Sequence, residues 1–153
     1  MRSSELKAGR TFGVVFDPGD DFFTALAAFC ADNDVRQGYI PMFLGAFSSV
    51  EVIGTCERVA DPMAPVWTRV HAANVEAVGC GTLAWDPERG LAVPHVHISV
   101  GMKERSAQAL TSHLMAATVQ FVAELMVVEV ADPPMRRPPN PHMYDVPLLE
   151  FQG

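Results

Sequence analysis

The sequence has no run of basic residues and few charged residues of any kind. Only 19% of the 153 residues are Asp, Glu, Lys or Arg, and the net charge is -7. Binding to nucleic acid or to anionic lipid depends on clustered Lys and Arg, so we expect no direct contact with nucleic acid and no membrane association. Because 49% of the residues are hydrophobic, little charge is available to cover the surface, which favours buried subunit interfaces.

Long apolar stretches are also absent. Residues 1–10 contain no apolar segment of the kind found in secretory signals, and no later stretch is long enough to cross a bilayer. We therefore expect a cytoplasmic protein. Cysteine is scarce: Cys30, Cys56 and Cys80 are widely spaced in apolar or strand-like sequence. This pattern favours reduced thiols in the core over disulfides or a catalytic nucleophile.

The residue pattern predicts one α+β domain in which strands predominate around a single main helix. The helix is expected at about residues 21–32, with Asp20 or Asp21 as its cap and with Asn33 and Asp34 at its end. Residues 103–115 are ambiguous because they favour helix, and residues 59–65, broken by proline, are expected as a surface loop. Strands are expected at residues 10–16, 39–47, 48–56, 66–71, 75–85, 93–100 and 118–130.

The chain divides into an N-terminal tail (residues 1–9), the folded domain (residues 10–130) and a proline-rich extension (residues 131–153). At this length one hydrophobic core is enough. Six of the twelve prolines lie in the extension. We therefore expect the extension to be extended and able to drape over a neighbouring subunit.

The most informative motif is His95-Val96-His97, within a run of β-branched residues. Alternate residues of a strand share one face, so the two imidazoles can converge on a single metal ion. His113 is the candidate third ligand. Two histidines on a strand can also be hydrogen-bonded side chains that line a wet face, and spacing alone leaves both interpretations open. The turn residues 86–90 predict an antiparallel hairpin between this segment and residues 75–85.

Four segments occur in the order seen in the plants and prokaryotes conserved (PPC) domain family. They are Gly-Ala-Phe-Ser-Ser-Val at residues 45–50, Pro-His-Val-His-Ile-Ser at 94–99, Ser-His-Leu at 112–114 and Val-Gln-Phe-Val-Ala-Glu-Leu at 119–125. The sequence resembles this family over about residues 10–130. The resemblance implies a compact α+β domain of mostly antiparallel strands, assembled as a trimer. It also places His95, His97 and His113 at the family's metal site, with Glu124 on a neighbouring strand.

The family fold is similar, more distantly, to that of acetolactate decarboxylase, in which a zinc ion held by histidines polarises oxygen atoms of the substrate. The chain departs from the PPC pattern at Thr111-Ser112, where the family usually has Gly-Gly before the third histidine. DNA-binding plant members also use a separate Arg-Gly-Arg-Pro hook in the minor groove. Residues 135–139 (Met-Arg-Arg-Pro-Pro) are the nearest approach here, and they lack the glycine and the flanking basic residues.

Two classes of function follow. Three neutral imidazoles suit zinc and leave a fourth position for water or substrate, which is the arrangement of catalytic sites and favours a metal-dependent lyase, isomerase or cyclase. The likeness to acetolactate decarboxylase implies that the metal acts as a Lewis acid on a small oxygen-rich molecule. The alternative is a non-catalytic PPC module that acts as a ligand sensor or DNA-associated regulator without an AT-hook.

Two further residues are candidates for catalysis. Glu124 can act as a general acid or base, or can make a buried hydrogen bond that orients a ligand imidazole. Arg10 can bind a substrate carboxylate through its planar fork, or can be a solvated strand end. His71 and His142 lie outside the motifs, and we expect both at the surface.

Overall fold

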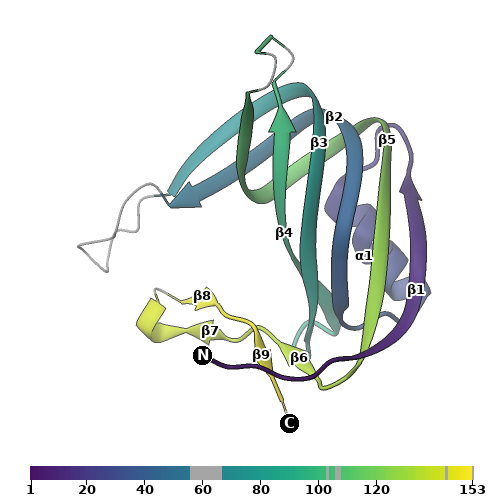
Figure 1. The fold of residues 1–153 in the computed structure, drawn as a ribbon, viewed down its shortest axis with the longest axis vertical. Helices are drawn as coiled ribbons and strands as arrows, with labels where there is room; N and C mark the ends of the chain where they lie inside the picture. The colour runs from purple at the N-terminus through teal and green to yellow at the C-terminus, as the bar shows by residue number, and fades with distance from the viewer. Residues whose placement is uncertain (56–66, 103, 106–107, 144, 153) are drawn as a thin grey trace.

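One antiparallel sheet with a helix on one face makes up most of the structure, a computed structural model that describes residues 1–55, 67–102, 104–105, 108–143 and 145–152 (Figure 1). The five strands lie in the order β1-β5-β2-β3-β4. The main elements are β1 (Lys7–Phe16), α1 (Phe22–Asp32), β2 (Gly38–Thr55), β3 (Trp67–Asp86), β4 (Leu91–Gly101) and β5 (Ala109–Asp132). The predicted domain with one helix and a mostly antiparallel sheet is confirmed. Among the described residues, no helix has the length and hydrophobicity that a membrane span requires.

Helix α1 begins and ends where the sequence predicts. The Asp21 side chain caps its first turn by accepting a hydrogen bond from the backbone N–H three residues later, at 2.8 Å. Its buried residues are Phe22, Leu26 and Cys30, which recur at helical spacing. The Phe22 ring is fully buried, and its centroid lies 5.1 Å from that of Phe43 on β2. This aromatic contact fixes the helix on the sheet.

The strands are longer and more strongly bent than the sequence predicts. Residues 39–47 and 48–56 are predicted as two strands, but β2 is continuous, and β3 likewise joins two predicted strands. The irregularities lie within the strands. The pairing of β2 with β5 shifts register on both sides of Phe47, and Asn74 on β3 has a φ of 52°. Bulges in continuous strands therefore give the same sequence signals as turns. The loop predicted at residues 59–65 lies outside the described residues.

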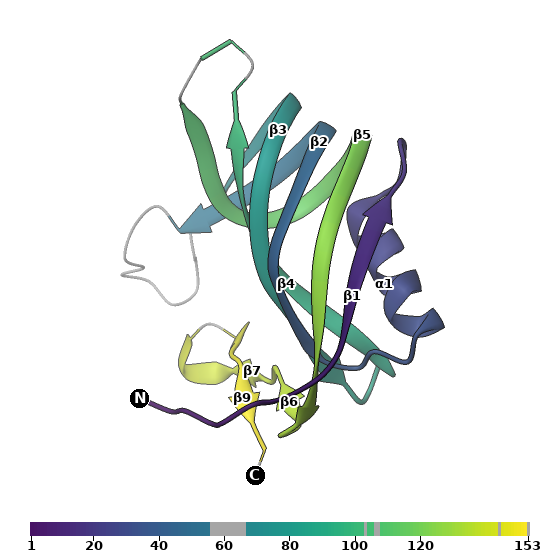
Figure 2. The ribbon, with the colours of Figure 1, turned by 45° about the vertical axis from the view of Figure 1, so that its right-hand side comes forward.

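Strand β5 curls the sheet back on itself. It is 24 residues long, because the ambiguous residues up to 115 continue into the predicted strand at 118–130. Most of β5 pairs with β1 and β2, but its first part pairs with β4, from Ala109 opposite Gly101 to His113 opposite His97. Figures 1 and 2 show β5 crossing from one edge of the sheet toward the other. The ladder with β4 overrides the local helix propensity of residues 109–115.

Of the two cysteines that the structure describes, one is buried in the core and the other is exposed. Cys30 is buried, as predicted, and burial raises the pKa of its thiol to about 11. Cys80 on β3 is exposed, so the prediction of a core thiol is wrong there. Its neighbour Gly79 faces the core, where an added Cβ would overlap the Phe43 ring, and Cys80 points to the opposite face because strand residues alternate. Cys56 lies outside the described residues.

The proline-rich extension folds back on its own domain instead of being simply extended. It forms two short antiparallel ladders at one end of the sheet (Figure 1). The ladders pair β6 (Met135–Arg136) with β9 (Glu150–Phe151) and β7 (Pro139–Asn140) with β8 (Val146–Pro147), with a 3-10 turn at Pro141–Met143. These two short ladders thus give the extension a defined backbone path despite its prolines.

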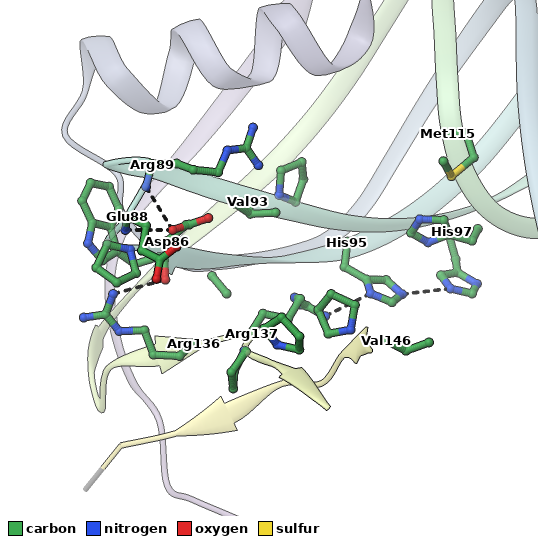
Figure 3. Close-up of a pocket in the computed structure, with 18 of the residues that line it drawn as sticks. Asp86, Glu88, Arg89, Val93, His95, His97, Met115, Arg136, Arg137 and Val146 are labelled. Atoms are coloured by element: carbon green, nitrogen blue, oxygen red, sulfur yellow. Dashed lines mark hydrogen bonds between the residues drawn. The ribbon is translucent and has the colours of Figure 1, made fainter. Parts of the chain in front are cut away.

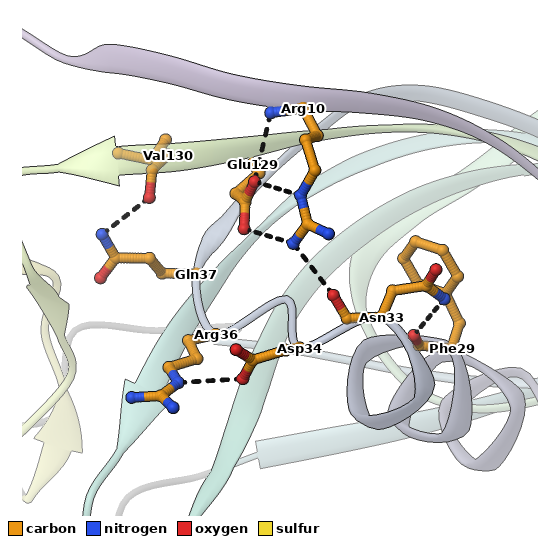
Figure 4. A network of polar contacts seen from close by, with 8 residues as sticks. All are labelled: Arg10, Phe29, Asn33, Asp34, Arg36, Gln37, Glu129 and Val130. Carbon is orange, nitrogen blue, oxygen red and sulfur yellow. Dashed lines mark hydrogen bonds and ion pairs between the residues drawn. The ribbon is translucent and has the colours of Figure 1, made fainter.

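A buried glutamine fixes the point where the extension leaves β5. The Gln37 amide donates to the carbonyl oxygen of Val130 at 2.9 Å (Figure 4). It also donates to the carbonyl oxygen of Pro133 at 2.9 Å and accepts from the backbone N–H of Met135 at 2.6 Å. Gln37 is only 9% exposed, so these backbone groups have no ready replacement in water. One side chain therefore sets the direction of the chain after β5.

Gln37→Ala should release the extension while leaving the sheet folded. Each buried group left without its partner costs about 1–3 kcal/mol, so hydrogen exchange should accelerate at the Met135 amide and beyond it. Gln120→Ala is the matched control, because the Gln120 side chain makes its hydrogen bond to Asn74 at an exposed position. Unchanged exchange in the extension of Gln37→Ala would show that Gln37 does not hold it.

Candidate metal centre

Three histidines meet where β4 pairs with β5. His95 and His97 project from one face of β4, whereas Val96 and Ile98 point into the core. His113 lies directly opposite His97 in the ladder, and opposite residues of an antiparallel pair share a face. The alternation predicted for the His-x-His motif is therefore present, and strand pairing brings the third histidine to it.

The spacing of the ring nitrogens fits a single metal ion. The Nε2 atoms of His95 and His97 lie 3.1 Å apart, and one nitrogen from each of the three rings lies within 4.8 Å of the other two. Two nitrogen ligands of a tetrahedral zinc ion lie roughly 3.3 Å apart. The His95 and His97 rings are stacked, and the His113 centroid lies 4.7 Å from that of His95. Donor type, number and spacing thus fit a mononuclear site.

Thr111 and Ser112, which stand where the PPC pattern has Gly-Gly, hold His113 in the strand. The Ser112 hydroxyl donates to the carbonyl oxygen of Ile53 on β2 at 2.5 Å. The Thr111 hydroxyl donates to the side-chain hydroxyl of Ser99 on β4 at 2.9 Å. These bonds tie β5 to both neighbours just before the histidine. The departure from the family pattern therefore leaves His113 in the cluster.

The histidines form part of the wall of a pocket of about 1020 Å³ (Figure 3). The pocket lies between β4, the β3–β4 turn and the C-terminal extension. A volume of this size with largely apolar walls suits a small molecule. Its lining includes apolar Val93, Pro94, Met115 and Val146, and charged Asp86, Glu88, Arg89, Arg136 and Arg137.

Arg137 joins the extension to the histidines. Its Nη1 lies 3.0 Å from His95 Nδ1, and its Nη2 donates to the Thr82 hydroxyl. Arginine only donates, so His95 Nδ1 accepts, and the ring proton of His95 lies on Nε2, facing His97 Nε2. A metal ion held by His95 Nε2 would require this proton on Nδ1, which could then no longer accept a hydrogen bond from Arg137. Metal binding and the contact between Arg137 and His95 would therefore be linked.

His95 and His113 are held in the neutral form at neutral pH. Burial lowers the pKa of His95 to about 4, and the positive charge of Arg137 and the neighbouring His113 and His97 contribute further. Burial also lowers the pKa of His113, followed by the effects of His97 and Arg137. Metal ions bind the neutral imidazole, so these two residues present the form that binds.

Arg10 is held elsewhere. Its Nε and Nη2 lie 2.8 Å from the two carboxylate oxygens of Glu129, and Nη2 also donates to the carbonyl oxygen of Asn33 (Figure 4). This side-chain hydrogen bonding raises the pKa of Arg10 and lowers that of Glu129. The guanidinium thus ties β1 to β5 and to the end of α1, and it does not line the pocket.

Glu124 shares a sheet face with the histidines but does not reach them within the chain. It is exposed on β5, opposite Val15 on β1 and Leu44 on β2. Both β2 and β3 lie between this part of β5 and β4, a path of roughly 14 Å along the sheet. His71 and His142 are exposed, as predicted.

Two polar residues of the site, Arg137 and Thr82, are missing from the sequence prediction. In the sequence, residues 135–139 stand out only as an incomplete version of the Arg-Gly-Arg-Pro hook. The available signal is an arginine in a proline-rich, otherwise apolar extension of a chain with few charges. The sequence alone does not show that this arginine reaches the histidines, because its position depends on the path that Gln37 sets for the extension.

Comparison with known proteins identifies the family. A model of the Plants and Prokaryotes Conserved (PCC) domain matches residues 3–131. The chain belongs to this family. The resemblance read from the sequence is confirmed. A search of curated protein sequences finds no match.

Solved structures share the fold over almost the whole chain. A metal-containing protein from Archaeoglobus fulgidus is 18% identical, with a TM-score of 0.81 over 98% of this chain and 99% of that one. A PPC protein from Pyrococcus horikoshii is 20% identical, with a TM-score of 0.80 over 100% and 99%. A protein from Bacteroides thetaiotaomicron, described as a candidate DNA-binding protein, is 20% identical, with a TM-score of 0.76 over 95% and 97%.

The decarboxylase fold is also similar, as predicted. Acetolactate decarboxylase from Bacillus subtilis is 11% identical, with a TM-score of 0.57 over 83% of this chain and 54% of the enzyme. This chain therefore corresponds to about half of that protein, and the likeness is one of fold.

In metal-free protein, acid should destabilise the fold through His95. Its pKa is about 4 in the folded chain and about 6.5 when unfolded. Between these values the unfolded chain binds a proton that the folded chain does not. The free energy of unfolding should therefore decrease as pH falls from about 6.5 to about 4, and His95→Gln should remove part of that decrease. Urea unfolding of chelator-treated protein measures it, with the exposed His142→Gln as control; equal pH dependence in all three proteins would contradict it.

Proposed function

We propose that this chain binds one divalent metal ion, zinc by the chemistry of its ligands, through His95, His97 and His113, and that the site binds a small oxygen-bearing molecule. The convergence of three imidazoles at the wall of a pocket carries the proposal. Three protein ligands leave one position for water or a ligand, as in catalytic zinc sites, whereas structural sites use four. The similarity in fold to the metal-containing protein from Archaeoglobus fulgidus supports the proposal.

A zinc ion bound there supplies a Lewis acid for an oxygen atom of the ligand. The residues of the chain position the metal ligands, limit the access of water and add positive charge. The strand ladder holds the imidazoles in place, the apolar walls around Val93 and Met115 limit the access of water, and Arg137 adds positive charge beside His95. This combination supports a lyase, isomerase or cyclase of small molecules. The similarity in fold to acetolactate decarboxylase is an analogy.

A ligand sensor without turnover is the second candidate function, and one observation favours it. Within the described pocket, no acidic side chain stands beside the histidines to act as general acid or base. Asp86 and Glu88 belong to the β3–β4 turn, where the Asp86 carboxylate accepts the backbone N–H groups of Glu88 and Arg89 at 2.9 and 3.1 Å. The net charge of -7 argues against direct DNA contact.

Protein purified without a His tag or chelator should contain about one zinc ion per chain. His97→Ala removes one of three ligands, so its metal content should fall far below that of the wild type, with circular dichroism unchanged. His142→Ala makes the same substitution at an exposed position in the extension and should keep its metal. Elemental analysis measures all three proteins. If His97→Ala keeps the metal content of the wild type, the proposed three-histidine site is wrong.

We also propose that the protein is a homotrimer that uses the outer face of the sheet. Strand register places Val15, Leu44 and Val78 in one row across β1, β2 and β3, with Glu124 of β5 between the first two. These three apolar side chains are 62%, 47% and 49% exposed. Exposed apolar side chains clustered on a sheet face are typical of a contact surface; here Leu44 and Val78 are direct neighbours, and Glu124 separates Val15 from Leu44. The same face carries the histidines, so in the proposed trimer the metal centre would lie near a subunit boundary.

Light scattering should report a mass about three times the 16.6 kDa of the chain. Leu44→Glu places a charge in the apolar row and should shift the mass toward that of the monomer. Leu6→Glu is the matched control, because Leu6 is 40% exposed but lies in the N-terminal segment ahead of β1. A wild-type mass of 16.6 kDa would end the proposal.

A further inference from the structure

Arg137 has no negatively charged partner among the described residues. Four exposed arginines each pair with a carboxylate: Arg2, Arg10, Arg36 and Arg69. Arg137 is half-buried and lines the pocket, yet its described contacts, His95 Nδ1 and the Thr82 hydroxyl, are both uncharged. Its Nε is buried and lacks a hydrogen-bond partner within the same described part of the chain. Arg136, also half-buried at the pocket, bonds to the carbonyl oxygen of Trp85. Arg137 is thus the described arginine that combines enclosure, no counter-ion and a buried nitrogen without a partner.

A half-buried positive charge without a counter-ion is unfavourable, and the neutral histidines do not compensate it. A bound metal ion adds further positive charge at the same wall of the pocket. We propose that the missing counter-ion is the carboxylate of a ligand: the pocket binds a small carboxylic acid whose acid group is held by Arg137 while a neighbouring oxygen faces the three histidines. This inference rests on the proposed metal-dependent function.

The geometry narrows the class of acid. Arg137 Nη1 is in hydrogen-bond contact with one nitrogen of His95, and the other nitrogen of the same ring faces His97. The arginine and the metal-binding atoms are thus separated by one imidazole ring. A ligand that reaches both must carry its oxygen donor within one or two carbon atoms of its carboxylate. Val93 and Met115 in the wall can then contact its apolar remainder.

A metal ion held through His95 Nε2 would make Arg137 available, because the ring proton would then lie on Nδ1 and the contact with Nη1 would open. The guanidinium would offer the freed N–H donors to the pocket, and its planar fork matches a carboxylate. The extension therefore supplies the residue that recognises the acid, and the sheet supplies the metal ligands.

Calorimetric titration of metal-loaded protein with malonate tests this assignment. Malonate carries a second oxygen donor one carbon from its carboxylate, and malonamide has the same shape without charge. Wild-type protein should prefer malonate to malonamide. Arg137→Gln should weaken malonate binding by roughly 10- to 100-fold, the loss of a charge-assisted hydrogen bond, and should leave malonamide binding unchanged. Arg89→Gln makes the same charge change at an exposed position in the same pocket and should weaken malonate only slightly.

Metal content, measured on the same samples, separates the two proposals. If wild type and Arg137→Gln hold equal metal and bind malonate equally, the carboxylate site is wrong and the metal centre stands. An equal loss of malonate affinity in Arg89→Gln and Arg137→Gln would show that malonate responds only to the overall positive charge of the pocket. That result would also contradict the carboxylate site at Arg137. If wild type holds no metal but malonate binding still requires Arg137, the metal proposal fails and the carboxylate site stands.

Discussion

The pairing of the first residues of β5 with β4 is the contact on which the site depends. It closes the curled sheet and sets His113 opposite His97. The register of this pairing is fixed by the core, because Ile98 and Leu114 beside these histidines are each 1% exposed. A slip of one residue would turn Leu114 to the surface and His113 into the core. The apolar alternation that builds the core therefore also brings the three imidazoles together.

The C-terminal extension is the second part of the chain on which the site depends, and two polar side chains fix its course. Gln37 fixes where the extension leaves β5, and Arg137 fixes where it meets β4. From Arg136 onward, several residues of the extension form a wall of the pocket. The site thus combines three separate parts of the chain. The sheet gives it rigid metal ligands, and the extension gives it enclosure and positive charge.

The sequence predicts the elements that local chemistry determines. Helix α1 is correct because Asp21 caps it and its apolar residues recur at helical spacing, and the β3–β4 hairpin is correct because turn residues separate two β-rich segments. The continuous strands β2 and β3 are not predicted, because bulges and turns share small residues such as those around Phe47. Residues 109–115 favour helix locally, and only their partner strand makes them β.

The candidate site divides in the same way. His95 and His97 share a face by strand alternation alone, and His113 joins them through a resemblance that the strand pairing then explains. Arg137 depends on the path of a proline-rich segment that no periodicity describes. Arg10 and Glu124 show the converse: each has suitable chemistry, but Glu129 engages Arg10, and the strand order keeps Glu124 away from the pocket.

X-ray absorption at the zinc edge, on protein purified without chelator, tests the central claim most directly. The three-histidine centre predicts only nitrogen and oxygen neighbours, with the outer-shell scattering of three imidazoles and zinc–nitrogen distances of about 2.0–2.1 Å. Cys80 lies opposite His97 in the β3–β4 ladder and is exposed, so it is the nearest alternative ligand by register. A sulfur neighbour at about 2.3 Å, or the scattering of fewer than three imidazoles, would contradict the account.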